Sequence, residues 1–509
     1  MNVVVDGSPL TVGDVVAVAQ GKAKAIAGDN LDAGMEPAAA LVARAVANGH
    51  VVYGITTGFG ALASTSIPPD RASDLQYDLI RSHAAGVGDL MSAEIVRAML
   101  LCRARTLAQG HSGVRPVVVR TLLALLEHDI LPAVPSQGSV GASGDLAPFA
   151  HLALPLIGEG LVLTEDGPMP SGPILSAAGI TPITLGPKEG LSLLNGTEGM
   201  LAQGCLAVHR ARQIVDADDA ACALTVEALM GSLRPFDPRV HALRPHPGQA
   251  ESARRIRLLL EDSEICESHK DDFTHKIQDA YSLRCAPQVH GAVRDTIDHA
   301  ERVLSIELGS VVDNPIVFAE DGDVVSAGNF HGQPLAFVLD FLAIAVAELG
   351  SISERRTDRL LDPTRSGGLT PFLATDPGVS SGYMITQYTA AAIVAENRVL
   401  SHPASVDSIP TSGLQEDHVS MGWGAATKLA TVLTNAARVV AVELMCASQG
   451  AEQRQGLTGL ELGSGTKRVK QTVRSVCPPL VNDRPPGVDI AAIASLVEAG
   501  AFSTSNGEE

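Results

Sequence analysis

Apolar residues recur every three or four positions over much of this chain, which is the pattern of helices that bury one face or most of their surface. The pattern predicts helices over the following stretches: 70–83, 95–108, 117–131, 199–230, 290–309, 334–362, 382–400 and 423–450. Pro116 lies just before one of these stretches and Pro132 just after it, as expected at the two ends of a helix.

Other segments predict less regular structure. The first residues predict a short strand and a turn, followed by small helices through Ala47. Residues 51–60 predict a loop closed by glycines. Residues 161–187 are rich in Gly and Pro, and they predict a surface excursion with at most short strands. The tail from Ser503 is expected to fray.

These patterns predict an all-α fold. We expect a mixed, mostly helical N-terminal lobe over residues 1–200, carrying a small-residue loop at 141–144. Residues 201–509 are expected to form a long-helix bundle that serves as an oligomer core, because long helices in one lobe often associate in this way. The low aromatic content of 3% fits packed helices better than sheet.

Composition narrows the classes of function. The formal net charge of −20 argues against nucleic acid, whose binding needs clustered Lys and Arg, and against an anionic membrane surface. The seven cysteines are scattered without a CxxC pair, so neither a disulfide framework nor a zinc ribbon is expected. A cytoplasmic protein without a signal peptide is the simplest interpretation.

The most apolar window, residues 335–349, contains Asp340 and Glu348. We interpret it as a buried helix that is too short and too charged to span a bilayer. A group at His269, His275 and the neighbouring aspartates lacks a diagnostic metal-ligand spacing, and no metal site is expected.

The loop Gly141-Ala142-Ser143-Gly144-Asp145 is the first candidate for chemistry. It lacks the Lys of a phosphate-binding loop, and its glycines do not have the spacing of a dinucleotide-binding fingerprint. It misses the G-x-S-x-G nucleophile elbow by one residue, although a serine hydrolase with His83 or His151 as base stays open as a remote alternative. A plain turn and a backbone that reacts with itself are the other two interpretations.

Further polar motifs accompany this loop. They are Tyr53-Gly54 with TTGFG (56–60), SHAAG (82–86), NGT (195–197), QDAYSLRCAPQVHG (278–291), GNFHG (328–332) and QEDHVSMG (415–422). Together with GSVGASGDLAP (138–148), they resemble the aromatic amino-acid ammonia-lyase family in type and in order. The resemblance extends from about residue 52 to about residue 452, and it is strongest to the members that act on histidine.

The resemblance implies that Ala142, Ser143 and Gly144 form an autocatalytic prosthetic group, 4-methylideneimidazole-5-one. Such an electrophile helps because an amine is a poor leaving group and the β-hydrogen of an amino acid is hardly acidic. No external cofactor is then expected. Asp145 is placed to assist proton movement.

The resemblance also implies the other site residues. Tyr53 would be the general base, Arg284 would clamp the substrate carboxylate, and Asn195 and Tyr281 would bind the prosthetic group or its developing charge. Gln278 and Phe330 would line the pocket.

His83 and Glu416 would decide the substrate. An imidazole needs one hydrogen-bond donor and one acceptor, which a histidine and a carboxylate supply, whereas relatives that act on phenylalanine or tyrosine typically have Phe-Leu or His-Leu in place of Ser82-His83. The implied reaction converts L-histidine to trans-urocanate and ammonia, the first step of histidine degradation. A tyrosine or phenylalanine lyase or aminomutase of the same family is the alternative. The family also implies a homotetramer with shared active sites.

Overall fold

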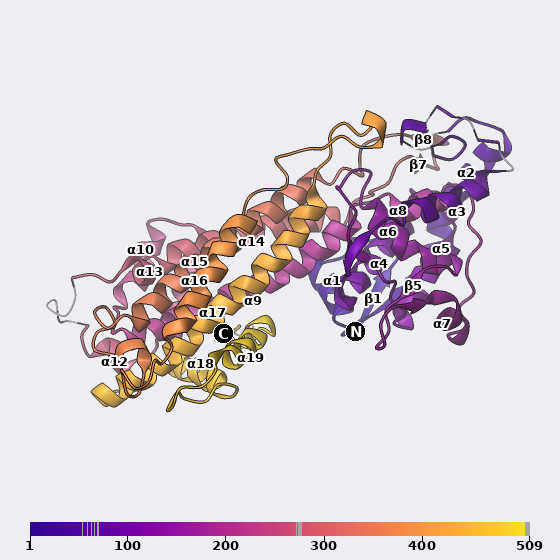
Figure 1. Ribbon diagram of the computed structural model, residues 1–509. Helices are drawn as coiled ribbons and strands as arrows, with labels where there is room; N and C mark the ends of the chain where they lie inside the picture. Colours follow the sequence, from indigo (N-terminus) through magenta and orange to yellow (C-terminus); the bar gives the residue numbers. More distant parts are fainter. Residues whose placement is uncertain are drawn as a thin grey trace. The chain divides into compact units, whose positions relative to one another are not determined.

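The computed structural model describes residues 1–52, 54–58, 60–62, 64–65, 67–68, 71–270, 272 and 277–503. The chain divides into two compact units (Figure 1). Unit 1 comprises Met1–Leu206, Glu301–Asp340 and Pro403–Thr427, and unit 2 comprises Ala207–Ala300, Phe341–His402 and Lys428–Glu509. Each unit is therefore built from three separate segments of the sequence.

Long helices dominate the chain, so the expected all-α fold is confirmed. The long helices are α9 (Glu198–Ala228), α14 (Ala286–Glu307), α15 (Gln333–Leu361) and α17 (Gly422–Thr458). Unit 2 also contains α10 (Pro238–Ala242), α11 (Pro247–Leu259), α12 (Glu264–Glu267), α13 (Tyr281–Arg284), α16 (Met384–Leu400), α18 (Ser464–Arg474) and α19 (Pro486–Glu498).

Unit 1 mixes shorter helices with very short strands. Its helices are α1 (Val12–Ala19), α2 (Leu31–Ala47), α3 (Ala72–His83), α4 (Ala93–Ala108), α5 (Pro116–Glu127), α6 (Leu146–Ala153), α7 (Ser171–Ala177) and α8 (Glu189–Leu194). Its strands are β1 (Asn2–Val5), β2 (Lys24–Ala27), β3 (Val87–Leu90), β4 (Pro135–Gln137), β5 (Leu161–Val162), β6 (Met169–Pro170), β7 (Ile316–Phe318) and β8 (Asp323–Val325). They form two-stranded ladders: β1 pairs with β2 in parallel, and β3–β4, β5–β6 and β7–β8 are antiparallel.

Local sequence signals explain several of these boundaries. Thr11 caps α1 by accepting a hydrogen bond from Asp14 N, and the Asp14 side chain accepts a hydrogen bond from Thr11 N. Pro116 occupies the first turn of α5, where a missing N–H costs nothing. Helix α4 has no single polar face, because it is buried from Ala98 through Ala108 in the core of unit 1.

The excursion over 161–187 differs from its prediction in one element. It contains the short strands β5 and β6, as expected, but also the helix α7. Leu175 of α7 is buried. Because α7 has only seven residues, it contains too few turns for a hydrophobic period to emerge from the sequence.

Among the residues that the structure describes, two helices, α15 and α17, are long and apolar enough to cross a membrane by length and composition alone. Their most apolar windows are, however, 61% and 78% buried within the protein itself. The window at 335–349 lies within α15, whose bounds agree with the helix predicted over 334–362, and most of it lies in the protein interior, as expected. The expectation that it is too short and too charged to span a bilayer is wrong by length and composition alone.

Unit 2 encloses a cluster of charged side chains. Arg356 of α15 lies 2.5 Å from Asp218 of α9 and 2.6 Å from Glu443 of α17, while His290 of α14 lies 2.9 Å from Asp218 and 2.7 Å from Asp219. Burial alone would lower the pKa of His290, but the two aspartates outweigh it and raise that pKa. Buried charges persist only when they are paired, so these contacts link four long helices of the bundle.

Candidate active site

The small-residue loop between β4 and α6 has an unusual backbone. Gly141, Ser143 and Gly144 all have positive φ, at +68°, +50° and +75°. This conformation is disfavoured for a residue with a Cβ, so Ser143 is a strained position of the kind that clusters at functional sites. The sequence predicted a tight loop here, and the left-handed conformation of its serine is an addition from the structure.

Glycine at position 144 is required by close packing. A Cβ there would overlap the backbone nitrogen and oxygen of Gly196. The Asp145 N–H donates to the Gly196 carbonyl at 2.8 Å, so the two loops lie backbone against backbone. A ring closure between Gly144 N and the Ala142 carbonyl needs the same absence of a side chain, and the residues present therefore fit the expected prosthetic group.

The segment 416–422 covers the other side of this loop. Ser420 Oγ donates to the Gly141 carbonyl at 3.0 Å, and Met421 N donates to the Val140 carbonyl at 2.8 Å. Ser143 Oγ donates to Glu416 Oε1 at 3.1 Å. The QEDHVSMG motif is thus brought directly onto the small-residue loop, although 273 positions separate Glu416 from Ser143.

Glu416 and His83 belong to one electrostatic environment. The second oxygen of Glu416 accepts from Thr411 Oγ1 at 2.7 Å. His83 is the last residue of α3, and Ser82 Oγ lies 3.1 Å from its Nδ1. Burial lowers the pKa of His83 from its ordinary 6.5, and a backbone hydrogen bond at Leu79 and the charge of Glu416 partly offset this effect. His83 is therefore held neutral near pH 7.

This geometry disfavours a serine hydrolase. A catalytic serine needs a histidine base at its hydroxyl, but in the described part of the chain the hydroxyl of Ser143 donates to Glu416. His151 instead accepts the Gly86 N–H at its Nε2, at 3.1 Å.

Asp145 is the fully buried anchor that follows the loop. Its Oδ2 accepts from Met200 N at 2.9 Å, in the first turn of α9, and its Oδ1 accepts from Ser139 Oγ at 2.9 Å. Burial raises the pKa of Asp145 from 3.8 to about 7, against the lowering effect of its hydrogen bonds. This carboxyl group therefore titrates close to neutral pH, which is a common property of functional sites.

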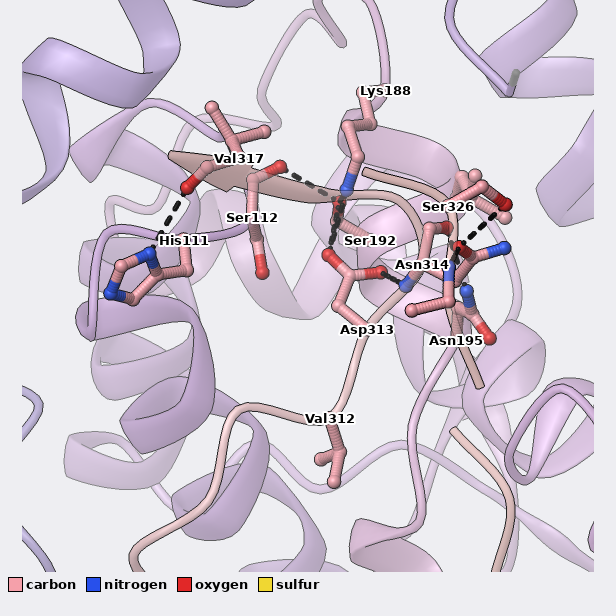
Figure 2. A network of polar contacts seen from close by, with 12 residues as sticks. His111, Ser112, Lys188, Ser192, Asn195, Val312, Asp313, Asn314, Val317 and Ser326 are labelled. Atoms are coloured by element: carbon pink, nitrogen blue, oxygen red, sulfur yellow. Dashed lines mark hydrogen bonds and ion pairs between the residues drawn. The ribbon is translucent and has the colours of Figure 1, made fainter. Parts of the chain in front are cut away.

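Asn195 directly follows α8, beside this loop. Its Nδ2 donates to the Asn314 carbonyl at 2.9 Å, while its Oδ1 is buried and has no hydrogen-bond partner among the described residues. Buried amide oxygens are normally satisfied, so an open acceptor at this position is available for a ligand. Figure 2 shows the amide nitrogen directed toward Asn314 and the oxygen directed away from it.

The loop with Phe330 also approaches the 416–422 segment. His331 Nε2 lies 3.2 Å from the His418 carbonyl, and the rings of the two histidines stack with centroids 5.9 Å apart. Phe330 itself is half-buried. Unit 1 thus brings together Ala142, Ser143, Gly144, Asn195 and Glu416, with His83 and the Phe330 loop close by.

Three other predicted residues belong to the second unit. Gln278, Tyr281 and Arg284 belong to unit 2, where the Arg284 guanidinium carbon lies 4.5 Å from the centre of the Tyr281 ring. Arg284 Nε also donates to the Asp279 carbonyl at 2.9 Å, and Tyr281 is 72% exposed. The structure therefore brings Tyr281 and Arg284 together. Tyr53, the predicted base, lies outside the described residues.

Sequence reasoning missed the buried charged residues that surround Ser192 and Asn195. Arg103 lies in the middle of the buried helix α4, and its guanidinium donates to Glu198 Oε1 at 2.5 Å and also to the carbonyl of Ser192. Lys188 pairs with Asp313 at 2.8 Å. For Arg103, the available signal was a charged residue within an apolar helical stretch. Within the described residues, no group of three or more His, Cys, Asp or Glu side chains is arranged to hold a metal ion.

Comparisons with known proteins agree along nearly the whole chain. The family described as aromatic amino acid lyase matches residues 10–475. The histidine ammonia-lyase of Gloeobacter violaceus is 50% identical over 505 residues, which cover 98% of this chain and 96% of that protein.

Two solved structures extend the comparison. The histidine ammonia-lyase of Trypanosoma cruzi has a TM-score of 0.90 and 43% identity, over 99% of this chain and 94% of that chain. The tyrosine aminomutase of Streptomyces globisporus has a TM-score of 0.93 and 39% identity, over 99% of this chain and 98% of that chain.

The raised pKa of Asp145 predicts a pH-dependent effect of its replacement. Between about pH 4 and pH 7 the group is ionised in the unfolded chain and protonated in the folded one, so its contribution to stability falls as pH rises and is fully lost above about pH 7. Asp145→Asn removes this loss. The unfolding free energy of the variant, relative to the parent, should increase by about 1.4 kcal/mol for each pH unit in that interval.

The measurement is a set of denaturant titrations from pH 4.5 to pH 8. Both proteins carry Ser143→Ala, so that chemistry at Ser143 does not enter the comparison. The exposed Asp321→Asn is the matched control for the loss of one carboxylate. A constant difference between variant and parent across this range would contradict the prediction.

Proposed function

Because this chain belongs to the aromatic amino acid lyase family, we propose that it removes ammonia from L-histidine and releases trans-urocanate, the first step of histidine degradation. It is a carbon–nitrogen lyase. The observation that carries the choice of histidine is the environment shared by His83 and Glu416 at the hydroxyl of Ser143. Both groups are polar, whereas a phenyl-binding pocket would be lined by apolar side chains at this place.

The residues at the loop would build the catalytic electrophile from the chain itself. A bond forms from Gly144 N to the Ala142 carbonyl carbon and one water leaves. The Ser143 Cα hydrogen and its hydroxyl leave as a second water. The resulting 4-methylideneimidazole-5-one supplies an electrophilic alkene that activates the substrate for loss of ammonia. The proposal contains no external cofactor and no metal.

The imidazole of the substrate would lie between His83 and Glu416. A neutral imidazole has one N–H donor and one nitrogen acceptor. Glu416 as a carboxylate accepts the N–H, and a neutral His83 donates to the other nitrogen, which its lowered pKa permits near pH 7. Each ring nitrogen then has one partner of the correct polarity, and that pairing discriminates strongly against a phenyl ring.

The remaining roles in the proposal rest on chemistry and on the family. Arg284 would bind the substrate carboxylate in bidentate fashion, and Tyr53 would remove the β-hydrogen. The resemblance implies that Asn195 binds the prosthetic group or its developing charge. Because its Nδ2 donates to Asn314, we propose instead that its Oδ1 accepts a hydrogen bond from the substrate amine. Tyr281 would bind the prosthetic group, while Gln278 and Phe330 would line the pocket.

The first test combines a product assay with a mass measurement. Purified protein given L-histidine should form urocanate and free ammonia, and the peptide that contains residues 142–144 should be lighter than its sequence by two water molecules. Ser143→Ala should abolish turnover and restore the unmodified mass. A peptide of unmodified mass with fluorophosphonate labelling of Ser143 would support the remote alternative of a hydrolase.

The same assay separates the lyase from the aminomutase alternative, which the similarity to a tyrosine aminomutase keeps relevant. Turnover of L-tyrosine to a β-amino acid, without urocanate from L-histidine, would overturn the proposed substrate and outcome. Urocanate formation with no β-amino acid from either substrate supports both.

Substrate selection by His83 has its own test. His83→Leu removes the proposed donor to the imidazole and leaves an apolar wall. The ratio of kcat/KM for L-histidine to that for L-phenylalanine should fall by about a hundredfold or more, because the imidazole nitrogen is left unpaired. His128→Leu, on the exposed end of α5, is the matched control. An unchanged ratio in the His83 variant would remove His83 from substrate recognition.

A homotetramer with shared sites completes the proposal. On α15, Phe337, Phe341 and Ile344 are spaced by four and three residues and are 42%, 44% and 46% exposed. Exposed aromatic and aliphatic side chains on one helical face are typical of subunit interfaces, and further copies of this chain are the proposed occupants. The seven cysteines are free thiols, which supports a reducing, cytoplasmic setting.

Complementation tests the shared sites. Tyr53→Phe and Ser143→Ala subunits should each be inactive alone, and hybrid tetramers that contain both should recover part of the activity, because some sites then combine two intact contributions. Hybrids are purified through two different affinity tags. Complete inactivity of verified hybrids would argue that each site draws Tyr53 and Ser143 from one subunit.

A further inference from the structure

We propose that the buried ion pair of Lys188 and Asp313 is a positioning device that orients the side chain of Asn195 for the reaction proposed above. The inference rests on that proposed function. Both charged side chains are 0% exposed, and 125 positions separate them in the sequence. Neither residue belongs to the motifs that identify the site, and both lie in the network behind Asn195 (Figure 2).

The pair is held by a third group. Lys188 Nζ lies 2.8 Å from Asp313 Oδ2 and donates to Ser192 Oγ at 2.9 Å. Ser192 Oγ lies 3.0 Å from the same Asp313 oxygen. One oxygen of Asp313 is therefore fixed by an ammonium and a hydroxyl together, which leaves the carboxylate little freedom to rotate.

The second oxygen of Asp313 carries this order to Asn195. Asp313 Oδ1 accepts from Asn314 N at 2.7 Å, and the Asn314 carbonyl accepts from Asn195 Nδ2 at 2.9 Å. Hydrogen bonds thus connect Lys188 through Asp313 to the backbone N–H of Asn314, and the carbonyl of the same residue is bound by the amide of Asn195. Each contact along this path lies at an ordinary hydrogen-bond distance.

Asn314 also connects to the loop that carries Phe330. Its own side chain accepts from Ala327 N at 2.8 Å and from Ser326 Oγ at 3.1 Å. The backbone of Asn314 is therefore fixed from the Asp313 side and its side chain from the Phe330 loop. Asn195 donates to a carbonyl that cannot shift without breaking several contacts.

The direction of the Asn195 amide is what this arrangement controls. A carboxamide has a donor end and an acceptor end of nearly equal shape, so packing alone does not fix which end faces a ligand. The bond from Nδ2 to Asn314 does so, and it leaves the buried Oδ1 open. In the proposed reaction, Oδ1 must face the substrate amine. The opposite orientation would place the Nδ2 donor of Asn195 against the amine, which is itself a hydrogen-bond donor.

A second buried ion pair, Arg103 with Glu198, holds the backbone near Asn195 and Asn314. Arg103 donates to Glu198, to the Ser192 carbonyl and, at 3.3 Å, to the Val312 carbonyl. The backbone at Ser192 and at Val312 is therefore held by Arg103 and does not depend on Lys188. Burying the Lys188–Asp313 pair costs desolvation energy, so the pair is a weak source of folding stability. We therefore assign its contribution to the orientation of the Asn195 side chain.

The experiment is a double-mutant cycle on turnover. Lys188→Met should lower kcat for L-histidine by about tenfold to a hundredfold, the loss typical of a displaced catalytic group, with KM little changed. In an Asn195→Ala background the same substitution should have no further effect on kcat, because the side chain that it orients is already absent. Non-additivity of this kind identifies groups that act as one unit.

Two more variants keep the test decisive. Ser192→Ala retains both charges of the pair and removes one hydrogen bond to each of them, so it provides the test if Lys188→Met fails to fold. It should also lower kcat, and this effect should disappear in the Asn195→Ala background. Glu189→Gln is the matched control, because Glu189 is the next residue on α8 and pairs instead with Arg115, at 2.7 Å. It should lower the melting temperature without a change in kcat.

The mass of the peptide across residues 142–144 gives a readout independent of turnover, and it should show the same loss of two waters in every variant. Equal losses of kcat in the parent and Asn195→Ala backgrounds, or an unchanged kcat in Ser192→Ala, would overturn the positioning role. Absence of urocanate from the unsubstituted protein would instead overturn the proposed function, and with it this inference.

Discussion

The buried carboxyl group of Asp145 joins the two backbone segments on which the site depends. Its side chain accepts hydrogen bonds from the start of α9 and from Ser139, and its N–H donates to the carbonyl of Gly196. The first turn of a helix has backbone N–H groups without helical partners, and α9 uses one of them to hold this carboxyl. The small-residue loop and the Asn195 loop are therefore attached to the same helix end.

Much of the fold could be predicted from the sequence because the long helices have enough turns to show their period. Helix ends are predicted less accurately where buried residues continue past the end of a helix. Helix α5 ends at Glu127, four residues before the predicted Leu131, because Asp129 adopts a left-handed conformation. Ile130 and Leu131 are nevertheless buried, and so they extended the apolar pattern past the end of the helix.

For the candidate site, the motifs predict that Ser143, His83 and Glu416 lie close together, and the structure places the Ser143 hydroxyl at Glu416. Their roles in a reaction stay a prediction. The buried ion pair near Asn195 could not be predicted. Lys188 and Asp313 meet across 125 positions, and no local pattern marks either one as the partner of the other. Local patterns also could not predict that residues 301–340 and 403–427 belong to unit 1, because packing between distant segments decides it.

Glycine appears on both sides of the contact between residues 144 and 196, but for two unrelated reasons. A Cβ at position 144 would meet the backbone of Gly196, whereas a Cβ at position 196 would meet the buried side chains of Arg103 and Glu198. Enlarging one glycine is therefore not compensated by any change in the other. In a mutational library of this protein, both positions should be invariant independently, without the covariation that ordinarily marks two residues in contact.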